Sequence, residues 1–183
     1  MTGAVTAAEL VRALPHVLDA PKTEAPVRML CVRPGHNRRV FPERIRVTRD
    51  GGVEGDFEMA MPWLRRPDGQ ADPRIQVSLL PLRVLDLVWR DREVTPHPGD
   101  TIVADLDVSL SNLPPGSLIG AGSAVLRVSD LWNSGCAKWK VRFGPAAHAW
   151  VSDPAHEALR LRGILCSVER DGEIGIGDPI IRL

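Results

Sequence analysis

A cysteine followed closely by two lysines is the strongest candidate for a reactive group in this sequence. Cys136 precedes Lys138 and Lys140, where a β-patterned run (124–129) gives way to a helix-compatible run (137–142). A thiol at a helix start feels the positive end of the helix dipole, and nearby ammonium groups strengthen that field. Both effects favour the thiolate, which is the nucleophilic form of cysteine. We therefore predict that Cys136 is the reactive residue and that Lys138 activates it.

Of two other interpretations of Cys136, a buried packing residue stays open on the local pattern and a protease nucleophile does not. Most free cysteines are buried and act as small apolar side chains, and this interpretation is kept for Cys31 and Cys166, which lie in strand-like runs. A nucleophilic cysteine usually recruits a histidine base. The sequence places no histidine beside Cys136, whereas activation by lysine needs none, so a Cys-His protease is disfavoured.

A glycine-containing loop and several arginines could hold an anion near this thiol. The run Gly52–Asp56 could present backbone N–H groups, but it lacks the spacings of nucleotide-binding loops, and the alternative is a turn with positive φ at Gly55. If the Pro/Gly-rich region that follows folds over a barrel mouth, its arginines would bind anions through their forked guanidinium groups. The predicted substrate- or cofactor-binding residues are Gly55, Asp56, Arg65, Arg66, Arg74, Ser78, Asn133, Lys140 and Arg142. No Cys/His spacing typical of a metal site occurs, so none is predicted.

The bulk composition limits the class of protein. The chain has 183 residues with 44% hydrophobic residues, enough for a domain with a core, and its formal net charge is zero. A neutral balance argues against a protein that coats nucleic acid or an anionic membrane. The three sparse cysteines suit a reducing compartment better than a disulfide scaffold. No apolar run approaches the roughly 20 residues that span a bilayer, so we predict a cytoplasmic protein.

The elements that would position these residues are mostly short strands. Strands are expected at 27–33, 44–48, 74–80, 101–103, 124–129, 163–169 and 179–182, and helices at 1–20, 81–91, 137–142 and 154–161. Strands and helices do not alternate regularly, which disfavours a doubly wound parallel sheet and predicts a mainly β fold: a β-barrel with a few flanking α-helices. We expect residues 1–26 to form a helical extension, kinked or split at Pro15, and residues 27–183 to form the barrel domain.

In order along the chain, these landmarks resemble the MOSC domain, the module named for the C-terminal part of molybdenum cofactor sulfurase. The resemblance runs from about Val27 to the C-terminus. Its motifs are the G-x-x-G-D element at Gly52–Asp56, the central strand at 74–80, the Leu-Pro and glycine stretch at 113–122, the characteristic cysteine at Cys136 and the closing hairpin at 162–178. Each motif is short, and their common order gives the resemblance its specificity.

The resemblance implies a barrel with a pocket at one end that binds molybdenum cofactor or another small substrate. It also implies that the cysteine handles sulfur, as a persulfide or a sulfur-bound intermediate. The first hypothesis is therefore an enzyme that handles sulfur on a small anionic substrate or on molybdopterin, by sulfur transfer or C–S bond chemistry, with a sulfur donor or a molybdoenzyme as a possible partner. The second is a non-catalytic module that holds the cofactor or a small ligand for a partner oxidoreductase. The sequence departs from the family pattern at Phe57, at 99–101 and at 133–135, all at ligand-facing places.

Overall fold

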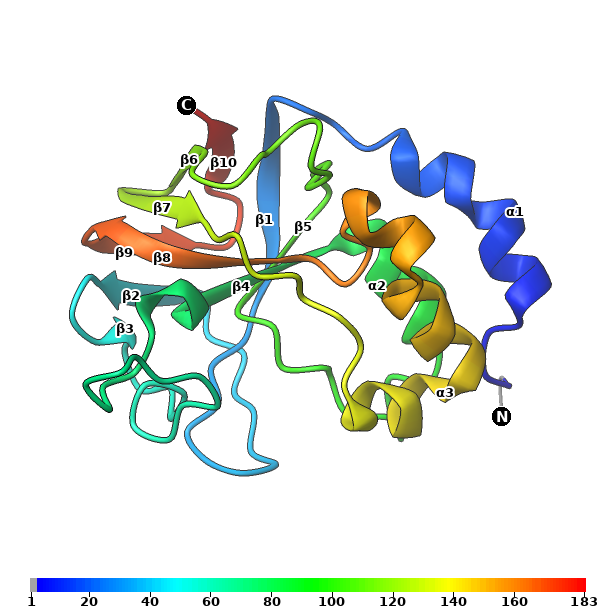
Figure 1. Ribbon diagram of the computed structural model, residues 1–183, viewed down its shortest axis with the longest axis horizontal. Helices are drawn as coiled ribbons and strands as arrows, with labels where there is room; N and C mark the ends of the chain where they lie inside the picture. The colour runs from blue at the N-terminus through cyan, green and yellow to red at the C-terminus, as the bar shows by residue number, and fades with distance from the viewer. Residues whose placement is uncertain (1–2) are drawn as a thin grey trace.

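Seven strands close into a β-barrel in the computed structural model, which describes residues 3–183 (Figure 1). The barrel strands are β1 (Glu24–Leu30), β4 (Val77–Pro81), β5 (Ile102–Ala104), β6 (Leu118–Ala121), β7 (Ala124–Val128), β8 (Ile164–Arg170) and β10 (Pro179–Arg182). Their order around the barrel is β1-β10-β6-β7-β8-β4-β5, and β5 pairs with β1 to close it. Only the β4–β5 pair is parallel within this barrel of the described chain. The predicted mainly β-barrel fold is confirmed.

A separate three-stranded sheet lies beside the barrel. It joins β2 (Arg44–Thr48), β3 (Gly52–Val53) and β9 (Gly172–Gly175) in the order β3-β2-β9. The strict alternation of the sequence at β2 predicts this strand correctly, since Ile45 and Val47 are buried and their neighbours are not.

The helices gather on one side of the barrel and cover β4 and β5 (Figure 1). They are α1 (Ala7–Leu18), α2 (Leu82–Val88) and α3 (Ala137–Ser152), with 3-10 turns η1 (Pro73–Ile75) and η2 (Pro154–Leu159). Leu79 and Ile102 point into the barrel core, whereas Leu80 and Val103 point into a second core beneath the helices. The two central strands are therefore buried on both faces, which is why their sequences are dominated by apolar residues.

The proline in the first helix does not split it. α1 is continuous across Pro15, and the N–H of Asp19 donates to the Pro15 carbonyl at 3.1 Å. At the other end, Thr6 and Glu9 form the capping box that the sequence predicts. The cost of the missing proline N–H is offset because the helix buries its apolar face in the second core. The expected split was therefore wrong, and the kink, which was the other expectation, stays a prediction.

Other element boundaries differ from the sequence prediction. Arg74 lies in η1 and not in the strand, because Pro73 starts a turn that the Asp72 side chain caps at the Arg74 N–H (2.9 Å). The predicted helix at 154–161 is the 3-10 turn η2, which ends at Arg160 in a left-handed conformation. β1 begins at Glu24. The predicted division of the chain into an N-terminal extension (1–26) and a barrel domain (27–183) stays a prediction. None of the helices described is long and apolar enough to cross a bilayer.

We expect Gly163→Ala to destabilise the fold strongly. Gly163 has φ +87°, and a Cβ there would lie 2.2 Å from the backbone oxygen of Leu79. A backbone clash adds to the left-handed strain, so the free energy of unfolding should fall by about 3 kcal/mol or more. Gly116→Ala is the matched control, because Gly116 has φ +86° with open space around it and should cost only about 1 kcal/mol. Equal losses in chemical denaturation would contradict this account.

Candidate functional site

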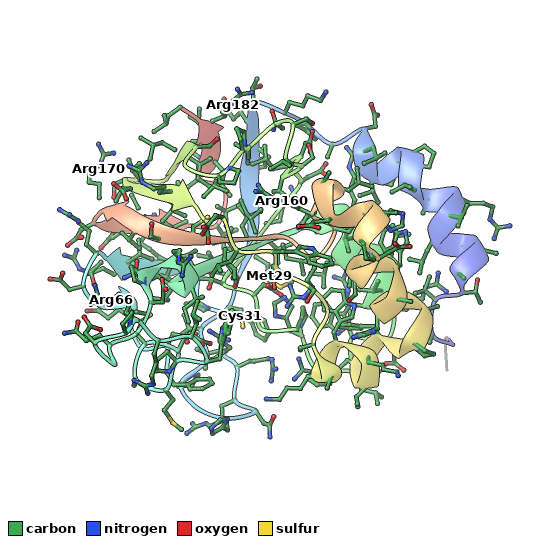
Figure 2. The ribbon with its side chains drawn as sticks, in the orientation of Figure 1. Met29, Cys31, Arg66, Arg160, Arg170 and Arg182 are labelled. Carbon is green, nitrogen blue, oxygen red and sulfur yellow. The ribbon has the colours of Figure 1, made fainter. Side chains whose placement is uncertain are left out.

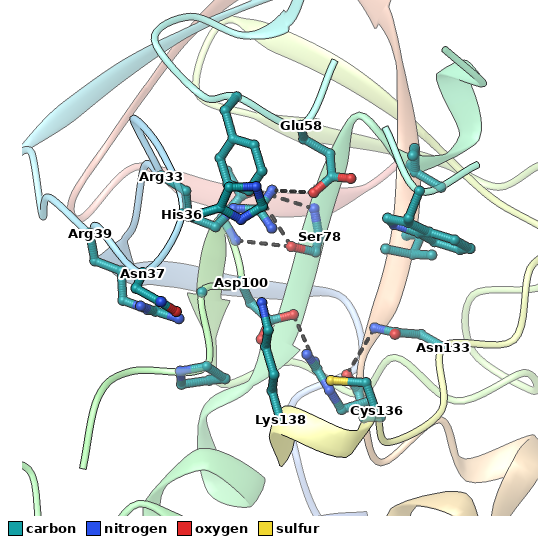
Figure 3. Close-up of a pocket in the computed structure, with 18 of the residues that line it drawn as sticks. Arg33, His36, Asn37, Arg39, Glu58, Ser78, Asp100, Asn133, Cys136 and Lys138 are labelled. Carbon is teal, nitrogen blue, oxygen red and sulfur yellow. Dashed lines mark hydrogen bonds and ion pairs between the residues drawn. The ribbon is translucent and has the colours of Figure 1, made fainter. Parts of the chain in front are cut away.

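A cavity of about 700 Å³ opens where β1 and β7 end and where β4, β5 and β8 begin. Its walls differ in chemistry. Six cationic side chains and two carboxylates line it: Arg33, Arg38, Arg39, Lys138, Arg142 and Arg162, with Glu58 and Asp100. Phe57, Met61, Trp63 and Trp132 provide an apolar part. Figure 3 shows Arg33, His36, Asn37 and Arg39 on one side of this space, with Asn133 across from them. A cavity with these walls suits a small anion that also carries an apolar part.

Cys136 is exposed and lines this cavity at the start of α3 (Figure 3). It is the N-cap residue, with extended φ and ψ of −84° and 171°, and its side chain makes no capping hydrogen bond. Gly135 fixes its backbone, because the Gly135 N–H donates to Ser152 Oγ at 3.0 Å and its carbonyl contacts His148 Nε2 at 2.9 Å. A Cβ at Gly135 would lie 2.9 Å from Ser152 Oγ, so glycine permits this approach.

The other two cysteines behave as the packing interpretation expects. Cys31 and Cys166 are buried, and Cys31 lies in the interior of the molecule in Figure 2. Burial raises the pKa of Cys31 to about 11 and that of Cys166 to about 12. Cys136 therefore differs from both by its exposure to the cavity.

The helix that follows Cys136 is shorter than its bounds suggest. At Gly144 the backbone takes φ 90° and ψ 167°, so the first helical segment ends at Phe143. A short segment contributes a weaker field than a long continuous helix. The larger local charges beside Cys136 are therefore the cationic side chains that line the cavity.

Two arginines that line the cavity with Cys136 retain donors for which the described residues show no partner. Arg142 donates one hydrogen bond, from Nη1 to the Pro98 carbonyl at 3.0 Å. Burial and the neighbouring Arg39 guanidinium lower the pKa of Arg142, while Cys136 and Asp100 oppose that shift. The guanidinium stays charged all the same. The Nε of Arg39 is buried without a hydrogen-bond partner in the described part of the chain.

Arg162 and Asp100 form a buried ion pair at the base of the cavity. Arg162 Nη1 lies 2.7 Å from Asp100 Oδ1, and the two side chains are only 11% and 2% exposed. The Arg162 guanidinium also lies 4.4 Å from the ring centroid of Trp139 in α3. Asn133 Nδ2 donates to the Arg162 carbonyl at 3.2 Å. These contacts connect the start of β5 to both sides of Cys136.

A second cationic residue, Arg33, is held by carboxylates from the loop after β3. Its Nε and Nη2 lie 3.1 and 3.0 Å from the two oxygens of Asp56, and Nη2 lies 2.9 Å from Glu58. Burial opposes the charged form, but Asp56 and Glu58 outweigh it and raise the pKa of Arg33. Asp56 also accepts the N–H groups of Arg33 and Glu58, at 2.8 and 2.9 Å. Asp56 does not line the cavity itself, but it holds Arg33 and Glu58, which do.

His97 lies buried in the loop before β5, which also contains Gly99 and Asp100. Its Nδ1 accepts the Gly99 N–H at 3.1 Å, and its ring packs edge-on against Trp89 and Phe41. Burial lowers the pKa of His97 to about 4, with Asp100 opposing this effect and Arg39 adding to it. The imidazole is therefore neutral at physiological pH and acts as a structural part of the loop.

The structure brings five of the predicted site residues to one cavity and leaves six outside its lining. Ser78, Asn133, Cys136, Lys138 and Arg142 line the cavity, whereas Gly55, Asp56, Arg65, Arg66, Arg74 and Lys140 do not. Gly55 has the positive φ that a turn requires, at +79°. Arg65 donates to the Gly69 carbonyl, Arg66 binds Gln70 at the periphery (Figure 2), and Arg74 pairs with Asp72 and Asp130. These local partners give Arg65, Arg66 and Arg74 a structural role, and their binding role stays a prediction.

Sequence reasoning did not identify several residues that form this cavity. Arg33 and Arg39 come from the loop between β1 and β2, whereas Asp100 and Arg162 come from two other loops far along the chain, and no spacing in the sequence connects the three segments. Asp100 alone carried a signal, since it lies at one of the departures from the MOSC pattern. Within residues 3–183, no group of three or more His, Cys, Asp or Glu side chains could hold a metal ion.

Comparisons with known proteins show the fold. No protein-family model matches the sequence, and no curated protein matches it either. Among solved structures, the chain is similar to the YuaD protein from Bacillus subtilis (TM-score 0.62, 20% identity, covering 86% of this chain and 94% of that one). It is also similar to a hypothetical protein (TM-score 0.58, 20% identity, covering 88% of this chain and 69% of that one). A third similar structure is YiiM from Escherichia coli (TM-score 0.53, 20% identity, covering 87% of this chain and 69% of that one). The closed barrel is consistent with a MOSC-type fold.

Asp56→Asn should destabilise the protein far more than loss of a surface ion pair. The change leaves Arg33 with a single carboxylate partner, and removing one member of this half-buried pair should cost about 2–3 kcal/mol. Glu169→Gln removes the partner of Arg127 at an exposed pair and should cost less than about 1 kcal/mol. Urea unfolding of both variants checks this, and a smaller cost for Asp56→Asn would contradict it.

Acid should destabilise the protein partly through His97. The unfolded imidazole binds a proton below about pH 6.5, whereas the native one does so only near a pKa of about 4. Stability from His97 is therefore full above pH ~6.5 and is lost as the pH falls towards ~4, by about 3 kcal/mol at most. His97→Asn keeps an acceptor for Gly99 but cannot titrate, so its stability should fall less steeply over this range. Thermal unfolding at several pH values checks this, and an equally steep loss of stability in the wild type and in His97→Asn would contradict this role.

Proposed function

We propose that this protein handles sulfur on a small anionic substrate, with Cys136 as the sulfur-carrying nucleophile. The observation that supports the proposal is the shared cavity: the exposed thiol of Cys136 lines the same space as Lys138, Arg39 and Arg142, and the buried Nε of Arg39 has no hydrogen-bond partner among the described residues. Cations around a thiol favour its thiolate and also attract an anion to it. Helix α3 carries Lys138 and Arg142 and has Cys136 as its N-cap, and its packing in the second core holds these groups against the barrel.

The simplest sulfur-transfer step needs no external oxidant. The Cys136 thiolate attacks the outer sulfur of a donor persulfide, R–S–SH, and a new S–S bond forms as the donor S–S bond breaks. The donor leaves as R–S⁻, and Cys136 becomes a persulfide. A nucleophilic substrate then takes the outer sulfur and regenerates the thiolate. Lys138 and Arg142 would hold the anionic group of the donor or substrate during both steps.

The molybdenum cofactor, which the MOSC resemblance implies, has a phosphorylated pterin that these residues fit. Arg39, with its unpartnered buried Nε, and Arg142 would hold the phosphate, and the indoles of Trp63 and Trp132 would face the flat pterin. When bound, the cofactor would supply the redox chemistry of its metal. The chain's own contribution would be to bind and orient it next to Cys136.

The same walls support a second function, a non-catalytic module that holds this cofactor or another small ligand for a partner oxidoreductase. The observation that favours it is that Arg33 and Arg162 are already neutralised by carboxylates, as in a preformed binding site. In that case Cys136 would merely line the cavity. Retention of a bound pterin by a protein whose Cys136 takes up no sulfur would support the module.

Cys136→Ser should abolish sulfur uptake. After treatment with inorganic polysulfide, the native intact mass should show added sulfur in the wild type and none in the variant, because Cys31 and Cys166 are buried. Sulfur uptake that is unchanged in Cys136→Ser would overturn the proposal.

The role of Lys138 is tested by the charge of the alkylating reagent. Lys138→Met should slow alkylation of Cys136 by anionic iodoacetate roughly fivefold relative to neutral iodoacetamide, since one cation near the thiol is lost. Lys140→Met is the matched control on the same helix, because Lys140 is exposed but does not line the cavity. If both lysine variants behave alike, Lys138 has no special role.

A further inference from the structure

A second hollow continues from the cysteine cavity along the outer face of α3. It has a volume of about 440 Å³, and Asn37, Ala137, Lys138 and Arg142 line both hollows. The residues that line only the second are Val94, Thr95, Pro96 and Val141, and we call this space the side groove. The cations beside Cys136 thus stand at the junction of two spaces, and nothing in the proposed sulfur chemistry uses the second.

The walls of the side groove are apolar although they face solvent. Val94 is 79% exposed and Val141 86% exposed, so two valines of the loop after α2 and of α3 present their side chains to the same open space. Valine is usually buried in folded proteins, and adjacent exposed apolar side chains at a hollow are typical of a binding surface. Pro96 and Ala137 extend this apolar lining.

The loop that forms one wall is held in place. Trp89 Nε1 donates to the Thr95 carbonyl at 2.6 Å, and the Thr95 N–H donates to the Asp91 carbonyl at 2.9 Å. The Val94 N–H also donates to the Asp91 side chain, at 3.2 Å. The side groove is therefore largely preformed, which lowers the entropy lost when a ligand binds.

The charge around the side groove selects an anion. Lys138 and Arg142 line it at the junction, and no carboxylate lines it among residues 3–183. A polypeptide would need partners for its backbone N–H and C=O groups, but Thr95 and Asn37 are the only uncharged polar side chains of this lining in the described chain. An aliphatic chain needs no such partners. The groove therefore suits a flexible apolar chain attached to an anionic head.

We propose that the side groove binds the aliphatic arm of an amphipathic anion whose charged head lies between Lys138 and Arg142. Val141 lies one helical turn beyond Ala137, roughly 6 Å along the axis, so an arm of several methylenes would pass over it. The placement of the ligand's reactive end at Cys136 rests on the proposed function, whereas the binding of the arm does not. The substrate class is thus narrowed from a small anion to one that carries an alkyl chain.

The test uses straight-chain carboxylates as probes of the full chain. Calorimetric titration should give a Kd that falls about twofold for each methylene from propanoate to octanoate, because the open groove covers part of each added group. Val141→Gln removes apolar surface without changing charge at an exposed helix position where glutamine is a good helix former. It should leave propanoate binding unchanged and remove most of the gain for octanoate. Val11→Gln, at a valine 68% exposed on α1, is the matched control and should retain that gain.

Three outcomes would overturn the inference. Equal Kd values for propanoate and octanoate would show that the groove takes no arm, and an unchanged octanoate gain in Val141→Gln would place the arm elsewhere. Tighter binding of N-acetyl-Val-Glu than of octanoate would assign the groove to a polypeptide. The Cys136→Ser protein separates the two proposals, because it should keep the chain-length dependence. Sulfur uptake in that variant overturns the function alone, and a lost chain-length dependence in the wild type overturns the groove alone.

Discussion

The segments on both sides of Cys136 contact one largely buried residue, Arg162. Its guanidinium pairs with Asp100 and covers the ring of Trp139, and its carbonyl accepts a hydrogen bond from Asn133. Burying a guanidinium is costly unless a carboxylate accompanies it, and Asp100 supplies that partner at 2% exposure. The pair therefore fixes the loop before β5 relative to the start of α3. Because its charge is already matched, it organises the cavity while other cations remain available for a ligand.

Much of the fold follows from local sequence patterns. Alternation predicts β2 and the dense apolar run predicts a central β4, because these patterns report directly on which faces are buried. Alternation also predicts the strand β7, although Val125 is buried as well as Ala124 and Leu126. The predicted ends of elements were wrong where a side chain or a tertiary contact determined where the element begins or ends. The Asp72 side chain caps a 3-10 turn that includes Arg74, so the strand begins later than predicted. Packing in the second core keeps α1 continuous at Pro15. Neither effect is visible in periodicity.

The site was less predictable because its parts come from distant loops. Cys136 and Lys138 were found since a helix start carries a local signal, and both line the cavity. Arg65 and Arg66 were expected there as well, yet a tight hairpin gives them partners a few residues away. Arg39 and Arg162 lie in segments far apart in the sequence, and only barrel closure brings them to one cavity. Charge alone therefore does not reveal which arginines face a ligand; the partners already bound to each one do.

Barrel closure also sets the order in which this protein can assemble during synthesis. β1 pairs with β5 on one edge and with β10 on the other, where Glu24 lies opposite Ile181, so the second edge of β1 has no partner until the last strand has left the ribosome. Until then, β1 has an open edge that invites pairing with other chains. The helices α1 and α2 emerge early and can shield the central strands in the meantime. The same pairing that makes the finished barrel edgeless leaves the nascent chain dependent on its helices for protection.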